Sequence, residues 1–280
     1  MPPRRVCPWL SSERPLVFGH RGARGLAPEN TLAAFDRGVA EGVDGLELDL
    51  RLSRDGVPVV IHDDDLGRTT DATGPVTALT TGQLARVDAG YRFARGQDYP
   101  WRGKGLGVPS LRDVLARYPA MPLIVEMKTN SAALALATVR EILAAGAAER
   151  VCVGSFGLRA LSAARRAAPQ LATSASETEV AWALFRSKVR HPLADARYQA
   201  YIVPERRRSL TIISPRFVHD AADCGCAVHV WTVNLPADVE RLLRWSVRGI
   251  LTDRPDVTVP LVQSHQNGVT HAKRGQTPFH

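Results

Sequence analysis

Several short apolar runs of the sequence end in side chains of the kind that enzymes use for proton transfer. The run at 16–19 is followed by His20 and Arg21, and the run at 57–61 is followed by His62. Imidazoles titrate near neutral pH, so a pair of them in one pocket would serve as general acid and general base. We therefore take His20 and His62 as the candidate proton-transfer residues.

Three carboxylates fall inside or at the end of two other apolar runs, Glu47 and Asp49 within 45–52 and Glu126 within 122–127. Residues two apart on a strand share a face, so Glu47 and Asp49 are expected about 6.5–7 Å apart along it. Converging carboxylates repel one another unless a cation neutralises them. Oxygen ligands suit Mg²⁺ or Ca²⁺ better than zinc, which predicts one divalent cation. The alternative is a carboxylate network with Arg and Lys that needs no metal.

Arg21 and Lys128 add two fixed positive charges near these runs. Together with a metal ion they suit a phosphate diester, because negative charge builds up on its non-bridging oxygens during reaction. No P-loop glycine pattern occurs in the chain. Nucleoside triphosphate chemistry is therefore not expected.

The elements that must position these residues alternate between apolar runs and helical patterns. Strands separated by helices form right-handed βαβ units and a parallel sheet. Eight such strands predict an α/β TIM (β/α)8 barrel, and a doubly wound open sheet is the second choice. The runs at 45–52 and 57–63 also predict a hairpin-like pair. The eight strands are expected to start near Pro15, Gly45, Pro122, Arg150, Leu171, Tyr201, Ala227 and Gly249.

We divide the chain into an N-terminal extension at 1–14, a barrel at 15–259 and a loose, mildly basic tail at 260–280. A small insertion follows the second strand at about 64–108. Loops at the strand ends set function on this fold, so the insertion is expected to influence substrate preference. Its aromatic side chains would line a groove or, alternatively, form the insertion's own core; they are Tyr91, Phe93, Tyr99 and Trp101.

The composition of the chain limits the protein class, the location and the partners that are expected. The chain has 280 residues, 45% of them hydrophobic and 23% charged, as in ordinary folded proteins. No apolar run is long enough for a transmembrane helix, and no apolar signal segment follows the basic start. The four scattered cysteines predict free thiols and a cytoplasmic location. The net charge of +8 reflects either a codon bias toward Ala, Arg, Gly and Pro or attraction to a phosphate ester or a lipid surface. No nucleic-acid-binding motif accompanies it.

The runs GHRGARGLAPENTLAAF, GLELDLRLSRDGVPVVIHDDDLGRTT, LIVEMK, VWTVN and GILTDRPD together resemble the glycerophosphodiester phosphodiesterase family. The likeness extends from about Leu16 to Asp256 and implies a TIM barrel with a small insertion after the second strand. It also implies a metal-dependent hydrolase that converts glycerophosphodiesters, as small-molecule substrates, to sn-glycerol 3-phosphate and an alcohol.

Carried over position by position, the resemblance implies a role for each candidate. A divalent cation, Mg²⁺ or Ca²⁺, would be held by Glu47, Asp49 and Glu126, with His20 and His62 as acid and base. The substrate would contact Arg21, Lys128, Trp231 and Asn30, and Glu29 together with Asn30 would brace the first catalytic loop. The sequence does not decide which histidine is the base, nor between attack by the substrate's own 2-hydroxyl and direct attack by water.

Two other functions remain open at this stage. A lysophospholipase D acting at membranes would use the same chemistry, and a non-catalytic binding protein would use only the fold. The intact set of two histidines and three carboxylates argues against the latter. The Arg-rich stretch PERRRSL at 204–210 and the tail after Pro260 depart from the family pattern and leave substrate preference open.

Overall fold

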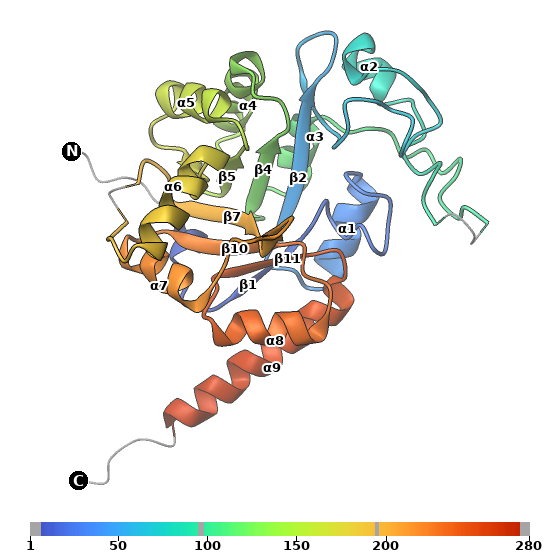
Figure 1. The fold of residues 1–280 in the computed structure, drawn as a ribbon. Coiled ribbons are helices and arrows are strands. Elements are labelled where there is room, and N and C mark those ends of the chain that lie inside the picture. The colour runs from blue at the N-terminus through green and yellow to red at the C-terminus, as the bar shows by residue number, and fades with distance from the viewer. Residues whose placement is uncertain (1–6, 95–97, 194–195, 275–280) are drawn as a thin grey trace, which may run out of the picture.

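The chain forms a barrel of parallel strands, seen in a computed structural model that describes residues 7–94, 98–193 and 196–274. Helices surround the barrel (Figure 1), and the α/β barrel expected from the sequence is confirmed. Each of the eight observed strands starts within one residue of its predicted position. They are β1 Leu16–Gly19, β2 Gly45–Leu52, β4 Leu123–Met127, β5 Val151–Gly154, β6 Ala172–Thr173, β7 Ala200–Pro204, β10 Ala227–Trp231 and β11 Gly249–Thr252.

The first and last strands are neighbours, which distinguishes a barrel from an open sheet. Strand β1 pairs in parallel with both β2 and β11, with Phe18 opposite Gly45 and Leu16 opposite Gly249. Among the described residues, β6 and β7 have no strand ladder between them but are joined by a parallel bridge from Ser174 to Ala200. The barrel is thus nearly closed, and the doubly wound alternative is wrong.

The seven helices expected between strands are also present. They are α1 Leu32–Ala40, α3 Leu111–Arg117, α4 Ala132–Ala144, α5 Leu158–Ala167, α6 Glu177–Lys188, α7 Pro215–Asp223 and α8 Pro236–Arg244. Side-chain hydroxyls cap the first turns of α1, α3, α4, α6 and α7. In α1 the cap is Thr31, which accepts a hydrogen bond from the Ala34 N–H.

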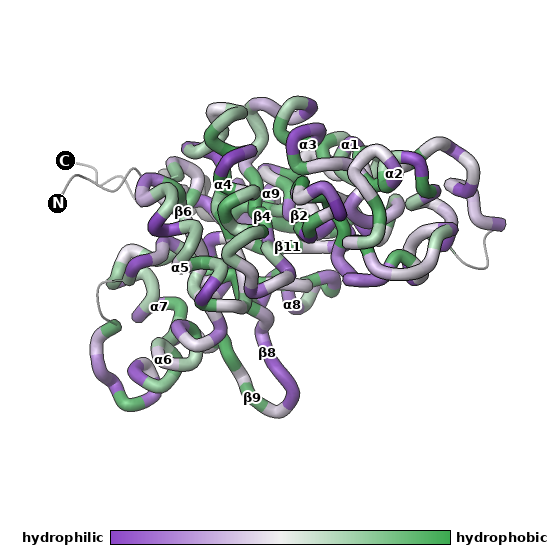
Figure 2. Tube along the Cα trace, turned by 90° about the horizontal axis from the view of Figure 1, so that it is seen from above, coloured by the Kyte–Doolittle hydropathy of each residue, from purple (hydrophilic) through white to green (hydrophobic). Residues whose placement is uncertain are grey.

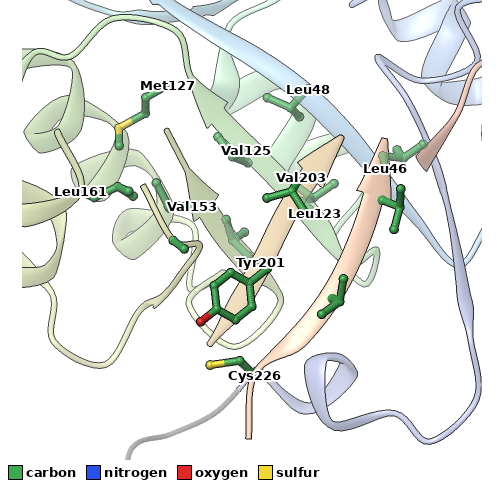
Figure 3. Packing of buried hydrophobic residues seen from close by; sticks show 14 of the residues in the cluster. Leu46, Leu48, Leu123, Val125, Met127, Val153, Leu161, Tyr201, Val203 and Cys226 are labelled. Carbon is green, nitrogen blue, oxygen red and sulfur yellow. The ribbon is translucent and has the colours of Figure 1, made fainter. Parts of the chain in front are cut away.

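Apolar and charged residues alternate along β2, so one face of the strand joins the core and the other faces the polar interior of the barrel. Leu46, Leu48 and Leu50 belong to the large apolar cluster between strands and helices, part of which Figure 3 shows. Neighbouring side chains on a strand point to opposite faces, so Glu47 and Asp49 point into the barrel. Burial of the leucines therefore fixes the direction of the carboxylates.

The N-terminal end of the barrel is filled by apolar and aromatic side chains. A short 3₁₀ helix, η1 Pro8–Ser11, brings Trp9 against the rings of Phe18 and His229, at centroid distances of 5.1 and 5.5 Å. Residues 1–6 of the predicted extension lie outside the described part of the chain. The packing leaves the opposite, C-terminal end of the barrel for a site.

The predicted hairpin and insertion are both observed. Strand β3, Pro58–Val60, pairs antiparallel with β2. The segment 64–108, of which 95–97 are outside the described residues, contains η2 Val76–Ala78 and α2 Thr81–Leu84 and has a small apolar core of its own. Its aromatics are not in that core, contrary to one of our two expectations. Instead, the rings of Tyr91 and Tyr99 pack on the guanidinium of Arg102, at 3.9 and 3.8 Å from their centroids.

The loose tail predicted for 260–280 is wrong as far as the structure describes it. Helix α9 spans Pro255–Arg274, although Pro260 lies within it. Val259 and Val262, one helical turn apart, are buried against the barrel, and Gln266 donates a hydrogen bond to the Pro15 carbonyl. Together with the partly buried Leu261 these valines form an apolar face too short to produce a helical pattern in the sequence. Within the described residues, none of the helices has the length and apolar character of a transmembrane segment.

Candidate active site

A cavity of about 650 Å³ opens at the C-terminal ends of the barrel strands. Among the predicted site residues, its walls include His20, Arg21, Glu47, His62, Glu126, Lys128 and Trp231. None of the described insertion residues lines it. Its other walls come from the loops after β5 and β6, from α6, and from a hairpin that follows β7, formed by β8 Arg206–Arg207 and β9 Leu210–Thr211. The expectation that the insertion shapes the pocket is therefore not supported by the geometry.

His20 stands at the end of β1 in a tightly folded loop. A Cβ atom on Gly19 would lie 1.7 Å from the Gly22 carbonyl oxygen, so only glycine allows this turn. The His20 Nδ1 atom is 2.6 Å from Oδ1 of Asp253, and Nε2 is 3.9 Å from Oε2 of Glu47. Asp253 thus orients the ring, leaving Nε2 toward the carboxylates.

His62 reaches the same cavity from the other strand of the hairpin. The backbone N–H of Ile61 donates to the Asp49 carbonyl at 3.0 Å, which holds His62 beside β2. Its Nδ1 atom lies 2.5 Å from Oδ1 of Asp63, and Asp63 in turn is paired with Arg68. Both imidazoles therefore have one nitrogen held by a carboxylate, an arrangement that fixes ring orientation.

Glu47, Asp49 and Glu126 converge as predicted, with one oxygen of each lying within 4.8 Å of the others. The Glu47 Oε2 atom accepts a hydrogen bond from the Arg21 backbone N–H at 2.8 Å. The buried Oδ1 atom of Asp49 has no hydrogen bond among the described residues, although the Lys128 Nζ atom lies 2.9 Å away. Three converging carboxylates, two of them buried, fit a hard divalent cation.

Arg21 and Lys128 are the cations nearest to these carboxylates. The Arg21 Nε atom is 3.1 Å from Asp49, and its Nη1 atom is 2.7 Å from Glu29. The Lys128 Nζ atom lies 2.9 Å from both Asp49 and Glu126. Both side chains line the cavity, so their charges face any anion that enters it.

Burial and neighbouring charges shift the protonation of the site. Burial, followed by the charge of Asp49, raises the pKa of Glu47 well above its ordinary value. Burial also raises the pKa of Glu126. For Asp49 the effect of burial is outweighed by Lys128 and Arg21, which lower its pKa. Burial lowers the pKa of His62. An added cation would restore the charged form of Glu47, as expected of a metal ligand.

Asn30 and Glu29 form hydrogen bonds with residues of the site. Asn30 is buried with a φ of 57°, its Nδ2 donates to Asp49 Oδ2 at 2.8 Å, and its Oδ1 accepts from the Asp49 N–H at 3.2 Å. Glu29 accepts hydrogen bonds from both Arg21 and Arg68. These bonds connect Asn30 to β2 and Glu29 to Arg21, and the bracing role that the resemblance implied for both residues stays a prediction. Asn30 is not part of the cavity wall, and its contact with substrate stays a prediction.

Trp231 lies at the end of β10 and lines the apolar side of the cavity. Its ring meets that of Phe156 edge to face, with centroids 6.1 Å apart. Further apolar side chains continue this wall: Ala175, Val180, Leu184, Ile202 and Ile212. The cavity thus has a charged half beside β1, β2 and β4 and an apolar half beside β7 and α6.

Two residues that bond the candidate site residues were missed in the sequence. Asp253 directly follows β11, so the rule that selected the other strand-end residues would have found it. Arg68 lies in the insertion with no such signal, yet it bonds both Asp63 and Glu29. It connects the surroundings of His62 with those of Arg21.

Comparison with known proteins agrees with this geometry. A profile of the Glycerophosphoryl diester phosphodiesterase family matches residues 20–257. The chain belongs to this family. It is accordingly a phosphoric diester hydrolase with glycerophosphodiester phosphodiesterase activity. The resemblance stated from the sequence is confirmed.

Individual relatives cover nearly the whole chain. A glycerophosphodiester phosphodiesterase of Caldanaerobacter subterraneus is 31% identical over 254 residues, covering 89% of this chain and 98% of that protein. The phosphodiesterase domain of an uncharacterized Mycobacterium tuberculosis protein has a TM-score of 0.77 at 25% identity, covering 90% of this chain and 99% of that one. An Oleispira antarctica phosphodiesterase, solved in complex with the product sn-glycerol-3-phosphate, has a TM-score of 0.71 at 26% identity, with 91% and 99% covered.

Proposed function

We propose that the protein hydrolyses glycerophosphodiesters to sn-glycerol 3-phosphate and an alcohol, with His20 and His62 transferring protons beside one divalent cation. The observation that carries the proposal is the shared cavity. It is lined by both histidines, each with its Nδ1 atom held by a carboxylate, and by Glu47 and Glu126. The product complex of the Oleispira antarctica relative supports sn-glycerol 3-phosphate as the product.

A cation at this place would be held by Glu47, Asp49 and Glu126, whose oxygens suit Mg²⁺ or Ca²⁺. When bound, it supplies positive charge for the phosphate oxygens as the transition state forms. Arg21 and Lys128 add donors on the same side of the cavity and would hold the phosphate.

In the proposed mechanism the glycerol 2-hydroxyl attacks phosphorus. One histidine takes the hydroxyl proton as the new P–O bond forms, and the other gives a proton to the departing alcohol oxygen as the old P–O bond breaks. Water then opens the cyclic phosphate with the two roles reversed. An internal nucleophile held in place can lower the barrier by about 7–11 kcal/mol in ideal cases.

Direct attack by water is the alternative mechanism, and one substrate distinguishes the two. A diester built on propane-1,3-diol lacks the 2-hydroxyl but keeps the phosphate and the leaving alcohol. The proposed mechanism predicts that this diester is not hydrolysed although it binds. Hydrolysis at a rate near that of the glycerol diester would contradict attack by the 2-hydroxyl.

The function itself is tested by assaying sn-glycerol 3-phosphate release from glycerophosphocholine, glycerophosphoethanolamine and glycerophosphoglycerol. The chelated protein should be inactive, and Mg²⁺ or Ca²⁺ should restore turnover. Glu47→Gln and Asp49→Asn should remove most activity and weaken cation binding measured by calorimetry, whereas Glu41→Gln, in an exposed ion pair with Arg37, serves as control. Full activity in excess chelator would overturn the metal assignment. Absence of product from every diester would overturn the function.

The apolar half of the cavity favours lysophospholipase D as a second candidate. Val180, Leu184 and Ile202 offer a wall that a small polar diester does not need but an acyl chain would cover. Turnover of lysophosphatidylcholine compared with glycerophosphocholine tests this, because the two share the same leaving alcohol. A higher kcat/KM for the lysolipid is the result expected of this candidate, and no turnover of it would exclude the candidate.

The proposed location is the cytoplasm. No disulfide bond joins the cysteines in the described part of the chain, and three of the four are buried. Cysteines without disulfide bonds are usual in a reducing compartment, which supports this location. Fractionation of cells that produce the tagged protein tests it.

A further inference from the structure

Helix α6 borders the cavity with one face and exposes apolar side chains on another. Val180 and Leu184 line the cavity. Trp182, Phe185 and the C-cap residue Val189 are 59%, 54% and 54% exposed, at the i, i+3 and i+7 spacing of one helix face. We call these three residues the outer stripe. The rings of Trp182 and Phe185 stack with centroids 5.6 Å apart, so the stripe presents an ordered aromatic surface.

The apolar surface continues on other elements around the cavity mouth. Leu210 on the β8–β9 hairpin and Phe156 after β5 are both exposed, and both line the cavity. The hairpin is held against α6 by an ion pair between Arg207 and Glu177. Figure 2 shows α6 and the hairpin close together, on the side of the molecule away from α2 and the insertion.

The charged side chains beside the outer stripe have mainly one sign. In the segments 177–193 and 205–211, the acidic residues Glu177, Glu179 and Glu205 are each paired with an arginine. Among the described residues, five nearby cations have no carboxylate partner: Arg186, Lys188, Arg190, Arg206 and Arg208. The apolar stripe is therefore accompanied by uncompensated positive charge.

We propose that the outer stripe and these cations form a docking surface for an anionic lipid bilayer. Exposed tryptophan and phenylalanine on a helix flanked by Lys and Arg are suited to the boundary between headgroups and acyl chains. Each basic residue near an anionic membrane surface contributes further attraction. Because α6 also lines the cavity, the docked protein holds its cavity mouth next to the lipid.

The charge favours a bilayer over a second copy of this chain. In a two-fold dimer the same patch faces itself, so the five cations of one protomer would lie opposite those of the other. Such a contact brings like charges together with no acidic partner among the described residues of the patch. An anionic bilayer supplies the opposite charge over the whole surface.

The experiment is co-sedimentation of the full chain with vesicles of phosphatidylcholine alone or with 30% phosphatidylglycerol, at 150 mM NaCl. Binding is expected only or mainly to the anionic vesicles. Trp182→Ala/Phe185→Ala should weaken the partition coefficient at least tenfold, since two aromatic side chains lose their apolar contact. Lys188→Ala/Arg190→Ala should weaken binding to anionic vesicles by about tenfold or more and leave binding to phosphatidylcholine unchanged.

Helix α4 offers a matched control, because Leu136 and Arg140 are exposed one turn apart on it. Leu136→Ala/Arg140→Ala should bind as the parent does. Equal binding by the parent protein and the Trp182/Phe185 variant, or no binding to anionic vesicles, would overturn the proposal. A stable dimer in light scattering would also overturn the proposal if Trp182→Ala/Phe185→Ala converted it to a monomer. The outer stripe would then bind a second copy of the chain.

The docking surface rests on the proposed function in one respect, because it adds a membrane partner to that enzyme. The variants lie outside the cavity wall and should keep their turnover of soluble glycerophosphocholine and their melting temperature. Vesicle binding without hydrolysis of any diester would contradict the proposed function alone. Hydrolysis without vesicle binding would contradict the docking surface alone.

Discussion

The Nδ1 atom of His20 lies 2.6 Å from Oδ1 of Asp253, although the two residues follow the first and last strands of the barrel. Asp253 is itself held by Asn234 at 3.1 Å. Burial would raise the pKa of Asp253, but its hydrogen bond and charge pairing with His20 outweigh burial and lower it. The closing of the barrel thus brings a carboxylate to the candidate proton-transfer residue.

Asp253→Asn should reduce kcat by about 100-fold or more, because His20 loses the carboxylate that fixes its ring and tautomer. KM and melting temperature should change little, and the pH profile of kcat should shift. Asp256→Asn, in an exposed ion pair with Arg254, is the matched control. An unchanged pH profile, with a loss of activity that follows only a loss of stability, would reduce Asp253 to a structural role.

Arg68 is expected to act as a positioning residue from the insertion. It joins Asp63 beside His62 to Glu29 beside Arg21. Arg68→Ala should lower kcat by roughly tenfold to 100-fold, as is usual when an outer partner of a site is removed. Arg68→Lys should recover only part of this, because lysine cannot bond both carboxylates in the same planar way.

The control for Arg68 is Arg54→Ala, whose side chain bonds only Ala78 and Gln83 within the described structure. It should leave steady-state kinetics unchanged. If Arg68→Ala behaved like this control, the positioning role of Arg68 would be contradicted.

The burial of His229 predicts that the free energy of unfolding, rather than the activity, depends on pH. It is fully buried between Trp9 and Phe18, neither ring nitrogen has a hydrogen-bond partner among the described residues, and burial lowers its pKa to about 3. The unfolded chain takes up this proton at its ordinary pKa of 6.5, before the folded chain does. From pH 6.5 down to about 3, the free energy of unfolding should fall by up to about 1.4 kcal/mol per pH unit from this group.

Urea unfolding of His229→Leu between pH 4 and 8 measures this contribution. The variant should lose less stability than the parent as the pH falls, since the other titrating groups are common to both. His219→Gln changes an exposed histidine and should follow the parent. If the free energy of unfolding fell equally with pH in His229→Leu and the parent, His229 would take up its proton equally in the folded and unfolded states, which would contradict the prediction.

Local patterns were enough to predict the barrel and most of its site. Leucines 46, 48 and 50 alternate with Glu47 and Asp49, and this alternation determines both the buried face and the direction of the carboxylates. Strand ends share one rim in a parallel barrel, which allowed His20, Glu126 and Trp231 to be assigned to one site.

What could not be predicted depends on contacts between distant segments. The cavity wall formed by α6 and the β8–β9 hairpin, rather than by the insertion, follows from how the loops fold over the barrel. The partnership of Arg68 with Glu29 spans 39 residues and has no local pattern. Helix α9 was missed because its apolar contacts are few and nearly consecutive, chiefly Val259, Leu261 and Val262, and form no helical repeat in the sequence.

The central claim is that His20 and His62 act as a distinct acid and base. His20→Ala and His62→Ala should each lower kcat on glycerophosphocholine by about 10²–10⁴-fold without loss of stability. Their effects should not add in the double variant, because both groups serve one step.

The most direct test compares both variants on glycerophosphocholine and on the 4-nitrophenyl ester of glycerol 3-phosphate. The nitrophenolate departs without a proton, so the variant that lacks the acid should release nitrophenolate in the first step at nearly the parent rate. The variant that lacks the base should remain slow. Equal recovery of both variants, or recovery of neither, would contradict the assignment of a separate acid and base.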